Sequence, residues 1–192
     1  RQVEWFAWAM MSQEFSRILG EDFLAPIASV VVVITWILVH TGSVFVGGLG
    51  MLQILLSIPF SFAFYKFVLG IPFFSQMHIL TIFLVLGVGA DDVFVLNDAW
   101  KQSFAAFPKK DGEDESELLK KRMYYAYKRT ASAVFNTSFT TAMAFVSTGI
   151  SPMMSISTFG WFASVCICVN YIFVITWTPT VILVHHLYVV PA

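Results

Sequence analysis

Two adjacent carboxylates, Asp91 and Asp92, stand inside the segment LVLGVGADDVFVLNDAW, which is otherwise almost entirely apolar. A carboxylate at the middle of a bilayer costs at least about 2.5 kcal/mol on insertion scales, and such residues usually mark ion pathways or proton relays. Carboxylates this close do not titrate independently, so we expect the two to share one proton. The pair can therefore accept a proton, or offer hard oxygen ligands to a small cation, and can release either.

The depth of this pair depends on where its membrane span begins. The uncharged run 67–90 could end a span just before the acids, but that span would include the glycine, proline and polar side chains of positions 70–78. A span that begins at Met77 leaves 14 residues before Asp91, too few to cross a core that takes about 20. We therefore expect a span over 77–98, in which Asp91 lies about 5 Å past the midpoint at about 1.5 Å per residue.

Small and polar residues accompany the acids. Gly87 lies one turn above Asp91, and Gly89 is close by, so another backbone or a water molecule can approach the pair. In NTSFTTAMAF, polar side chains recur along the helix expected over 131–150. They either support the acid pair or bond to their own helix backbone, as is common in membrane helices. These residues are Asn136, Thr137, Thr140 and Thr141.

Enzymatic uses of the acid pair fit poorly. Intramembrane aspartyl proteases carry G-x-G-D and a second aspartate on a neighbouring helix, whereas the spacing here is G-x-G-A-D and no other expected span holds an acid. Membrane prenyltransferases chelate magnesium with aspartates one turn apart, but position 95 is Val95. Asp98, near the inner end of its span, is expected to be hydrated. The four histidines lie at expected span ends without metal-ligand spacing. We expect no enzyme and no metal cofactor.

Composition places the chain in a membrane. Hydrophobic residues make up 58% of the sequence and charged residues 12%, the latter about half the share of soluble domains. A net charge of −1 argues against a nucleic-acid partner, which requires a basic excess. The C-x-C spacing of the two cysteines suits neither a zinc site nor a disulfide framework. The sequence begins at Arg1 without a signal peptide, and we interpret it as a fragment of a longer protein.

Hydropathy predicts an all-α membrane protein with an interfacial helix over 1–22, followed by a five-helix domain over 23–188. Residues 101–129 carry 13 charges in 29 positions and hold eight of the eleven Lys and Arg residues, which predicts a cytoplasmic loop. Acids precede bases in this loop, which predicts a helix, lying either on the inner membrane surface or in solvent. The expected spans are 23–41, 44–65, 77–98, 131–150 and 158–184.

The order of these motifs resembles that of a known domain. GVGADDVFVLNDAW, a basic loop, TSFTTAMAF and NYIFVITWTPTVILVHHLY are together similar to the sterol-sensing domain of the resistance–nodulation–division superfamily. The chain is most similar to the Dispatched proteins, then to Patched and Niemann–Pick C proteins, because an alanine precedes the acid pair where Patched relatives more often have valine. The resemblance implies spans two to six of the first half of a duplicated, twelve-span transporter.

The resemblance also implies a function. Asp91 and Asp92 match the family's ion-coupling acids, so a coupling cation, Na⁺ or H⁺, is expected, with sodium favoured. The implied partners are membrane sterol or lipid and a missing second half of the same chain, whose acids complete the coupling site. We expect a cation-gradient-coupled transporter of sterol or lipid-modified cargo, multi-pass in the plasma membrane or an endomembrane. The alternative is a sterol-sensing regulatory or scaffolding module without transport, which needs no buried carboxylates. The resemblance also suggests an apolar groove among the first three spans that holds sterol, with Gln76 or His78 near its hydroxyl; the alternative is that these are ordinary lipid-facing side chains.

Overall fold

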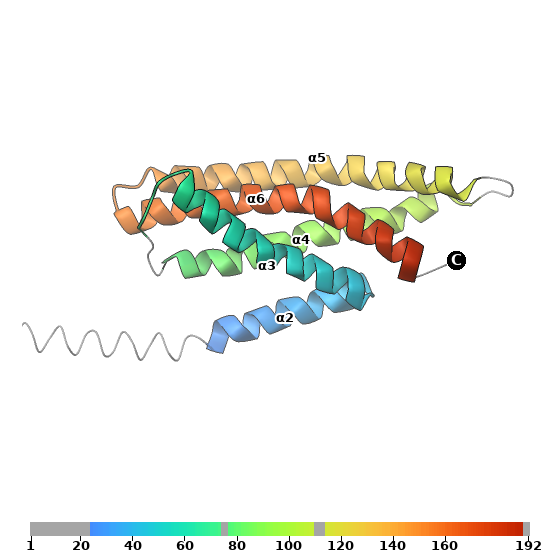
Figure 1. Cartoon of the computed structure of the whole chain (residues 1–192), viewed down its shortest axis with the longest axis horizontal. Coiled ribbons are helices and arrows are strands. Elements are labelled where there is room, and N and C mark those ends of the chain that lie inside the picture. Colours follow the sequence, from blue (N-terminus) through green and yellow to red (C-terminus); the bar gives the residue numbers. More distant parts are fainter. Residues whose placement is uncertain (1–23, 74–76, 110–113, 190–192) are drawn as a thin grey trace, which may run out of the picture.

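The computed structural model describes residues 24–73, 77–109 and 114–189. Every regular element in these ranges is helical, so the predicted all-α fold class is confirmed for them. The interfacial helix expected over 1–22 lies outside the described residues. The elements are α2 (Leu24–Thr41), α3 (Val44–Phe67), α4 (Met77–Ala106), α5 (Glu115–Gly149), α6 (Met154–Val184) and the π-helical turn η1 (His185–Val189) (Figure 1).

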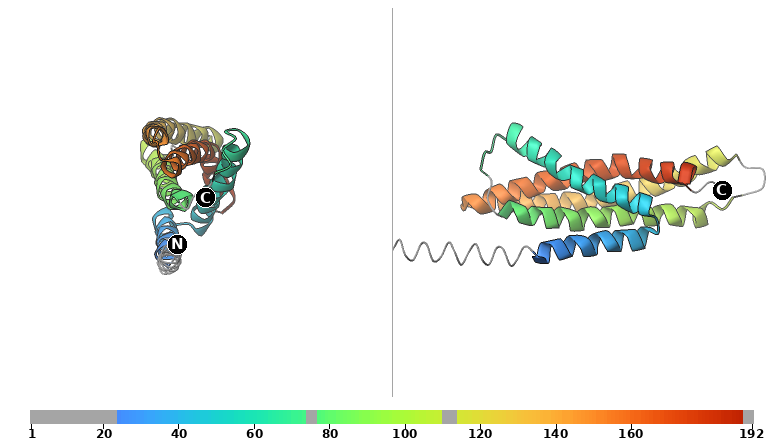
Figure 2. Two further views of the ribbon diagram at one scale, coloured as in Figure 1. Left: turned by 90° about the vertical axis from the view of Figure 1, so that its left-hand side faces the viewer. Right: turned by 60° about the horizontal axis from the view of Figure 1, so that its bottom comes forward.

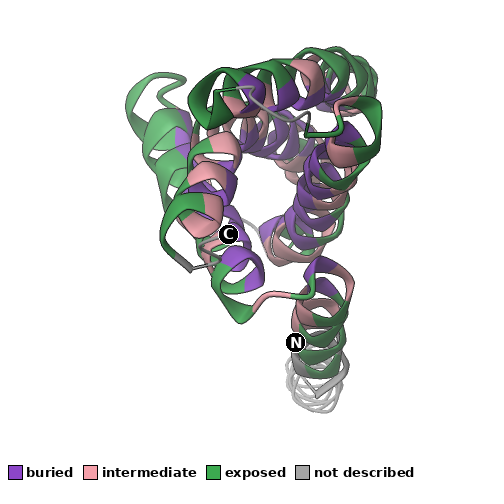
Figure 3. Ribbon diagram, turned by 90° about the vertical axis from the view of Figure 1, so that its right-hand side faces the viewer, coloured by how far each residue is buried: buried purple, intermediate pink, exposed green. Residues whose placement is uncertain are grey.

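Helices α3 to α6 form an elongated bundle, and α2 lies on its outside (Figure 2). α6 packs against α3, α4 and α5, whereas α2 packs against α3 and α4. Seen along the bundle, the buried faces of the helices point inward and the exposed faces outward (Figure 3). α4 and α6 therefore face each other in the interior of the bundle, and a polar side chain between them is shielded from lipid.

Three of the described helices are long and apolar enough to cross a membrane: Val44–Phe67, Met77–Ala106 and Met154–Tyr188. The apolar part of α2, Val30–Thr41, is shorter, and α5 is not among the three. The first half of α5 carries the charged loop residues, and its second half carries the hydroxyl side chains. The five-span topology and the cytoplasmic position of 101–129 therefore stay predictions.

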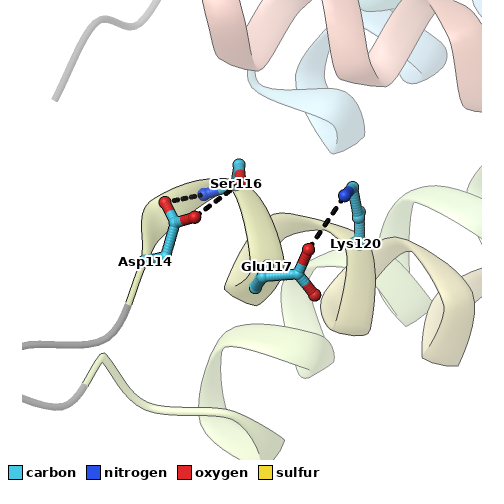
Figure 4. A network of polar contacts seen from close by, with 4 residues as sticks. All are labelled: Asp114, Ser116, Glu117 and Lys120. Carbon is cyan, nitrogen blue, oxygen red and sulfur yellow. Dashed lines mark hydrogen bonds and ion pairs between the residues drawn. The ribbon is translucent and has the colours of Figure 1, made fainter.

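α5 is a single helix of 35 residues, about 52 Å long at about 1.5 Å per residue. It joins the loop helix to the segment predicted as the fourth span without a break, and the position of the loop helix at the membrane surface or in solvent stays a prediction. The helix is unbroken because no glycine or proline interrupts the sequence before Gly149. Asp114 caps the start of α5, where its carboxylate accepts hydrogen bonds from the Ser116 amide, at 3.2 Å, and hydroxyl, at 3.1 Å (Figure 4).

The turn between α2 and α3 is set by Gly42, whose φ of 70° lies in the left-handed region. Glycine adopts this conformation without the steric penalty of a side chain, and it commonly ends a helix. The Gly42 amide donates to the Leu38 carbonyl at 3.2 Å, and α3 begins at Val44. The turn folds α3 back beside α2 and α4.

Two apolar clusters of buried residues stabilise the bundle. One contains Ile54, Tyr65 and Phe162, and it includes Ala90 of α4. The other contains Trp100 and Ile182 and includes Leu96 of α4. The acid pair follows Ala90 directly and precedes Leu96, so it lies on α4 between the two clusters. Apolar packing on both sides of this position fixes the surroundings of the acids.

Candidate functional site

The two acids have different environments. Asp92 is 3% exposed, whereas Asp91 is exposed on the surface of the bundle. Neighbouring residues of a helix point about 100° apart, so the interior receives only one of the two carboxylates. The structure thus places Asp92 in the interior and leaves Asp91 on a face that no described helix covers.

The partner of Asp92 is Asn170 of α6. The Asn170 Nδ2 group donates a hydrogen bond of 3.1 Å to Asp92 Oδ2, and both residues are buried. Among the described residues, neither Asp91 nor Asp92 forms an ion pair with a lysine, arginine or histidine. A hydrogen bond to a charged group contributes about 1.5–3 kcal/mol, less than the cost of burying an isolated charge. The hydrogen bond from the Asn170 amide is therefore not enough by itself to keep Asp92 ionised in the interior.

Gly89 makes room for this pair of side chains. A Cβ atom at Gly89 would lie 2.8 Å from Ile54 Cγ1 of α3 and 3.0 Å from Asn170 Oδ1 of α6. The missing side chain thus lets both helices approach α4 one turn above Asp92. Gly87 differs, because a Cβ there would meet nothing within 4 Å. Of the two glycines, Gly89 shapes the site in the described structure, and Gly87 leaves an open surface one turn above Asp91.

Oxygen atoms dominate the site. Asn170 Oδ1 is buried and has no hydrogen-bond partner in the described structure. Together with the Asp92 carboxylate, it gives the interior two oxygen-bearing groups from two helices. Carboxylate and carbonyl oxygens are ligands of hard cations. No group of three or more His, Cys, Asp and Glu gathers among the described residues. The arrangement therefore suits a small, exchangeable cation or a proton.

The polar residues predicted on the fourth span lie elsewhere. Asn136, Thr137 and Thr140 are exposed, and Thr141 is partly buried. The Thr140 hydroxyl donates to the Asn136 carbonyl at 2.9 Å, and that of Thr141 to the Thr137 carbonyl at 2.7 Å. Within the described residues no hydrogen bond joins them to Asp91 or Asp92. The geometry favours the alternative in which these side chains bond to their own backbone.

A second buried polar pair was not predicted from the sequence. The Thr178 hydroxyl of α6 donates to Gln53 Oε1 of α3 at 2.6 Å, and both residues are buried. Gln53 Nε2 and Asn97 Nδ2 are buried without a partner in the described structure. Polar groups in this state are commonly satisfied by internal water. The bundle interior therefore offers polar groups on three helices beyond the acid pair.

The sequence also singled out three further residues, Asp98, His78 and Gln76. Asp98 is about half exposed, in keeping with a hydrated side chain, and its Oδ2 lies 3.8 Å from His40 Nε2 of α2. His78, expected near a sterol hydroxyl, is fully buried and packs against Tyr65 and Phe162 at 5.8 and 5.1 Å between ring centroids. The proposed sterol contact of His78 is therefore wrong, because α3 and α6 cover the start of α4. Gln76 lies outside the described residues.

Comparison with known proteins identifies the family. Residues 23–184 match the family described as Patched SSD, the sterol-sensing domain. The chain belongs to the Patched sterol-sensing-domain family. It is 34% identical to human Protein dispatched homolog 1 over 174 residues, which cover 91% of this chain and 11% of the relative. It is 33% identical to Protein dispatched of Drosophila melanogaster over 155 residues, covering 73% of this chain and 13% of the relative.

A more distant relative is the NPC intracellular cholesterol transporter 1 of Sus scrofa. It is 22% identical over 186 residues, which cover 91% of this chain and 14% of the relative. The chain thus spans 11–14% of the length of these relatives. It carries the sterol-sensing domain of the resistance–nodulation–division superfamily, a membrane domain, and the predicted resemblance is confirmed.

The Asn170 contact leads to a first prediction. Asn170→Leu keeps a similar volume but removes the donor to Asp92, so we expect a loss of stability of about 1–3 kcal/mol. The measurement is the thermal unfolding midpoint of the full-length protein in detergent. Thr176→Val on the same helix is the matched control, because the exposed Thr176 hydroxyl bonds only to its own helix. If Asp92→Leu is already present, Asn170→Leu should cost less; an unchanged cost would show that the two side chains are not coupled.

Proposed function

We propose that this chain forms half of the membrane domain of a cation-gradient-coupled transporter, which moves a sterol or a lipid-modified cargo. Asp91 and Asp92 take up the coupling ion, and Asn170 and Gly89 shape their surroundings. One observation carries the proposal: Asp92 is 3% exposed, and in the described structure it is held by an amide and by no cationic side chain.

The energetics of burial support an ion-binding role. An unpaired buried charge is expensive, so Asp92 must be protonated, hydrated or bound to a cation. Binding or losing the ion then changes the free energy of the packed bundle. The gradient supplies enough energy to drive this change, because one charge crossing 100 mV gives about 2.3 kcal/mol before any concentration term. A structural carboxylate would instead be expected beside a lysine or arginine.

The position of Asp91 supports the proposal that the full-length protein has a second half of the membrane domain. Asp91 is exposed on α4 next to the open surface at Gly87. A carboxylate at membrane depth faces protein or water rather than lipid. We infer that another part of the full-length protein covers this face and supplies further polar groups to Asp91. The small share of the relatives' length that the chain covers supports this inference.

Sodium is the favoured coupling ion. The unpaired Asn170 Oδ1 serves a metal cation as an oxygen ligand, whereas a proton needs only the carboxylate. The test uses the full-length protein in liposomes that contain a fluorescent sterol, with imposed gradients of Na⁺ or of pH. We expect sterol movement to follow the Na⁺ gradient and to stop when K⁺ replaces Na⁺. Movement that follows only the pH gradient would identify a proton as the ion, and movement indifferent to both would contradict ion coupling.

The alternative of a sterol-sensing module without transport rests on a different feature. An apolar groove of about 290 Å³ lies between α3 and α6, where Trp177 and Thr176 lie opposite Phe45 and Leu49. Its aromatic and aliphatic walls, with two threonine hydroxyls, suit the apolar body and polar hydroxyl of a sterol. A module of this kind would bind sterol here and would not need the acid pair. The two proposals therefore differ in what they predict for Asp91 and Asp92.

A further inference from the structure

We propose that the bundle interior binds a water molecule between α5 and α6, which joins the Thr130 hydroxyl to the backbone carbonyl of Ile175. A cavity of about 10 Å³ lies where α4, α5 and α6 meet, and its lining includes Thr130, Ile175 and Pro179. This volume is at the lower limit of what one water molecule needs. We call it the Thr130 cavity. The proposal does not depend on ion binding at Asp92.

Pro179 frees a backbone acceptor at this cavity. It stands inside α6, and proline has no amide hydrogen to donate to the carbonyl four residues earlier. That carbonyl belongs to Ile175, which also lines the Thr130 cavity. The threonine hydroxyls that flank this turn of α6 donate to other acceptors. Proline is tolerated in a membrane helix where a neighbouring helix or an ordered water satisfies the freed group, so the Ile175 carbonyl requires a donor from outside α6.

Thr130 supplies the polar group from α5. It is 3% exposed, and its Oγ1 atom is buried without a hydrogen-bond partner in the described structure. Exposed threonines of α5 instead donate to their own backbone, as Thr140 does to the Asn136 carbonyl at 2.9 Å. Buried hydroxyls are rarely left without a hydrogen bond. Thr130 and Ile175 thus present two unsatisfied groups to the same cavity, and one water molecule satisfies both.

The lining of the Thr130 cavity favours water over a metal cation. None of its eight residues is charged, and a cation withdrawn from bulk solvent requires a compensating charge. A water molecule needs only about two to four polar partners. It can donate to the Ile175 carbonyl and accept from the Thr130 hydroxyl. The cavity therefore suits a small neutral ligand that both donates and accepts.

A water molecule at this point affects how α6 bends. The turn that Pro179 interrupts lies between Asn170, which donates to Asp92, and the turn η1 at the end of α6. Helices kink where proline or an inserted water interrupts the backbone hydrogen bonds. A bound water can keep both of its partners while the angle between the two parts of α6 changes. The segment 175–179 is therefore the point at which bending of α6 costs least.

The first test detects the water in the purified full-length protein in detergent, by X-ray hydroxyl-radical labelling and mass spectrometry. Radicals formed from a bound water oxidise the side chains beside it, even where bulk solvent has no access. Leu96 lines the Thr130 cavity, whereas Leu86 belongs to the other apolar cluster, and both are 2% exposed. We expect Leu96 to be labelled several times faster than Leu86, and Thr130→Val to reduce the Leu96 rate to that of Leu86. Equal rates in the wild type would overturn the proposal.

The second test uses the sign of a stability change. If the Thr130 hydroxyl had no partner, Thr130→Val would remove an unsatisfied buried group and raise the melting midpoint. With the water bridge, the same change deprives the Ile175 carbonyl of its partner, so the midpoint should fall by on the order of 2 °C. Ser138→Ala is the matched control, because the Ser138 hydroxyl is also buried on α5 without a partner in the described structure and does not line the cavity. It should leave the midpoint unchanged or raise it.

Pro179→Ala identifies the acceptor. Alanine restores the amide that donates to the Ile175 carbonyl, so Thr130→Val should no longer lower the midpoint in that background. Pro59→Ala, at an exposed proline inside α3, should leave the effect of Thr130→Val as it is in the wild type. A midpoint raised by Thr130→Val in the wild type would show that no bridge exists. An equal loss in the two alanine backgrounds would place the partner of Thr130 elsewhere, and either result would overturn the proposal.

Discussion

Replacing both Asp91 and Asp92 with asparagine is expected to reduce transport by the full-length protein to background, with expression and sterol binding nearly unchanged. Asparagine has the shape of aspartate but cannot bind and release a proton, and it is a weaker ligand for a cation. An amide is also cheaper to bury than a carboxylate, and at position 92 it can still bond to Asn170. The fold should therefore survive while the coupling step is lost. The measurement is cargo movement in liposomes that carry the Na⁺ gradient.

Single substitutions sharpen this experiment. Asp98→Asn is the matched control: this acid lies on the same helix two turns further on, is about half exposed and approaches His40. It should leave transport near the wild-type level. Asp92→Asn alone should remove most of the activity, because Asp92 is the buried member of the pair. Full transport by the double variant would end the ion-coupling hypothesis and favour the sterol-sensing module.

The sequence predicts those parts of the fold that depend on a single segment of the chain. The all-helical class follows from long apolar stretches, and Gly42 signals the turn between α2 and α3 because its positive φ requires glycine. The two adjacent acids in an apolar stretch likewise mark a candidate site, and the divergence of about 100° between helix neighbours explains why the structure buries Asp92 and exposes Asp91. These inferences need only one segment of the chain at a time.

The rest of the site depends on contacts between distant segments. Asn170 is 78 positions from Asp92, and Thr178 is 125 positions from Gln53, and no periodicity in either segment indicates its partner. A lone asparagine inside the apolar stretch 158–184 was the available signal. The polar residues of α5 were ambiguous for the same reason, because their spacing shows that they share a face but not whether that face is buried. In the structure, the buried face of α5 is a different one, which carries Val134, Ser138 and Ala142.

The second large prediction also depends on helix packing, and it concerns Gly160 of α6. A Cβ atom at this position would lie 2.5 Å from the Gly149 nitrogen and 2.6 Å from the Phe145 carbonyl oxygen. Both are backbone atoms of α5, so no side-chain rotation can relieve the clash. Small residues let membrane helices approach this closely. Gly160→Ala should force α5 and α6 apart where the end of α5, at Gly149, meets α6.

We expect Gly160→Ala to destabilise the full-length protein by about 2–3 kcal/mol, the upper part of the range for overpacked cores, and Gly160→Val to prevent its accumulation in the membrane. Gly48→Ala on α3 is the control, because a Cβ there would meet nothing within 4 Å. Its greater helix propensity should leave stability unchanged or raise it by up to about 1 kcal/mol. The measurement is the melting midpoint in detergent. If both alanine variants melted together with the wild type, α5 and α6 would not be in backbone contact at Gly160. A lowered midpoint for Gly160→Ala alone would establish that contact as the point that joins the two helices.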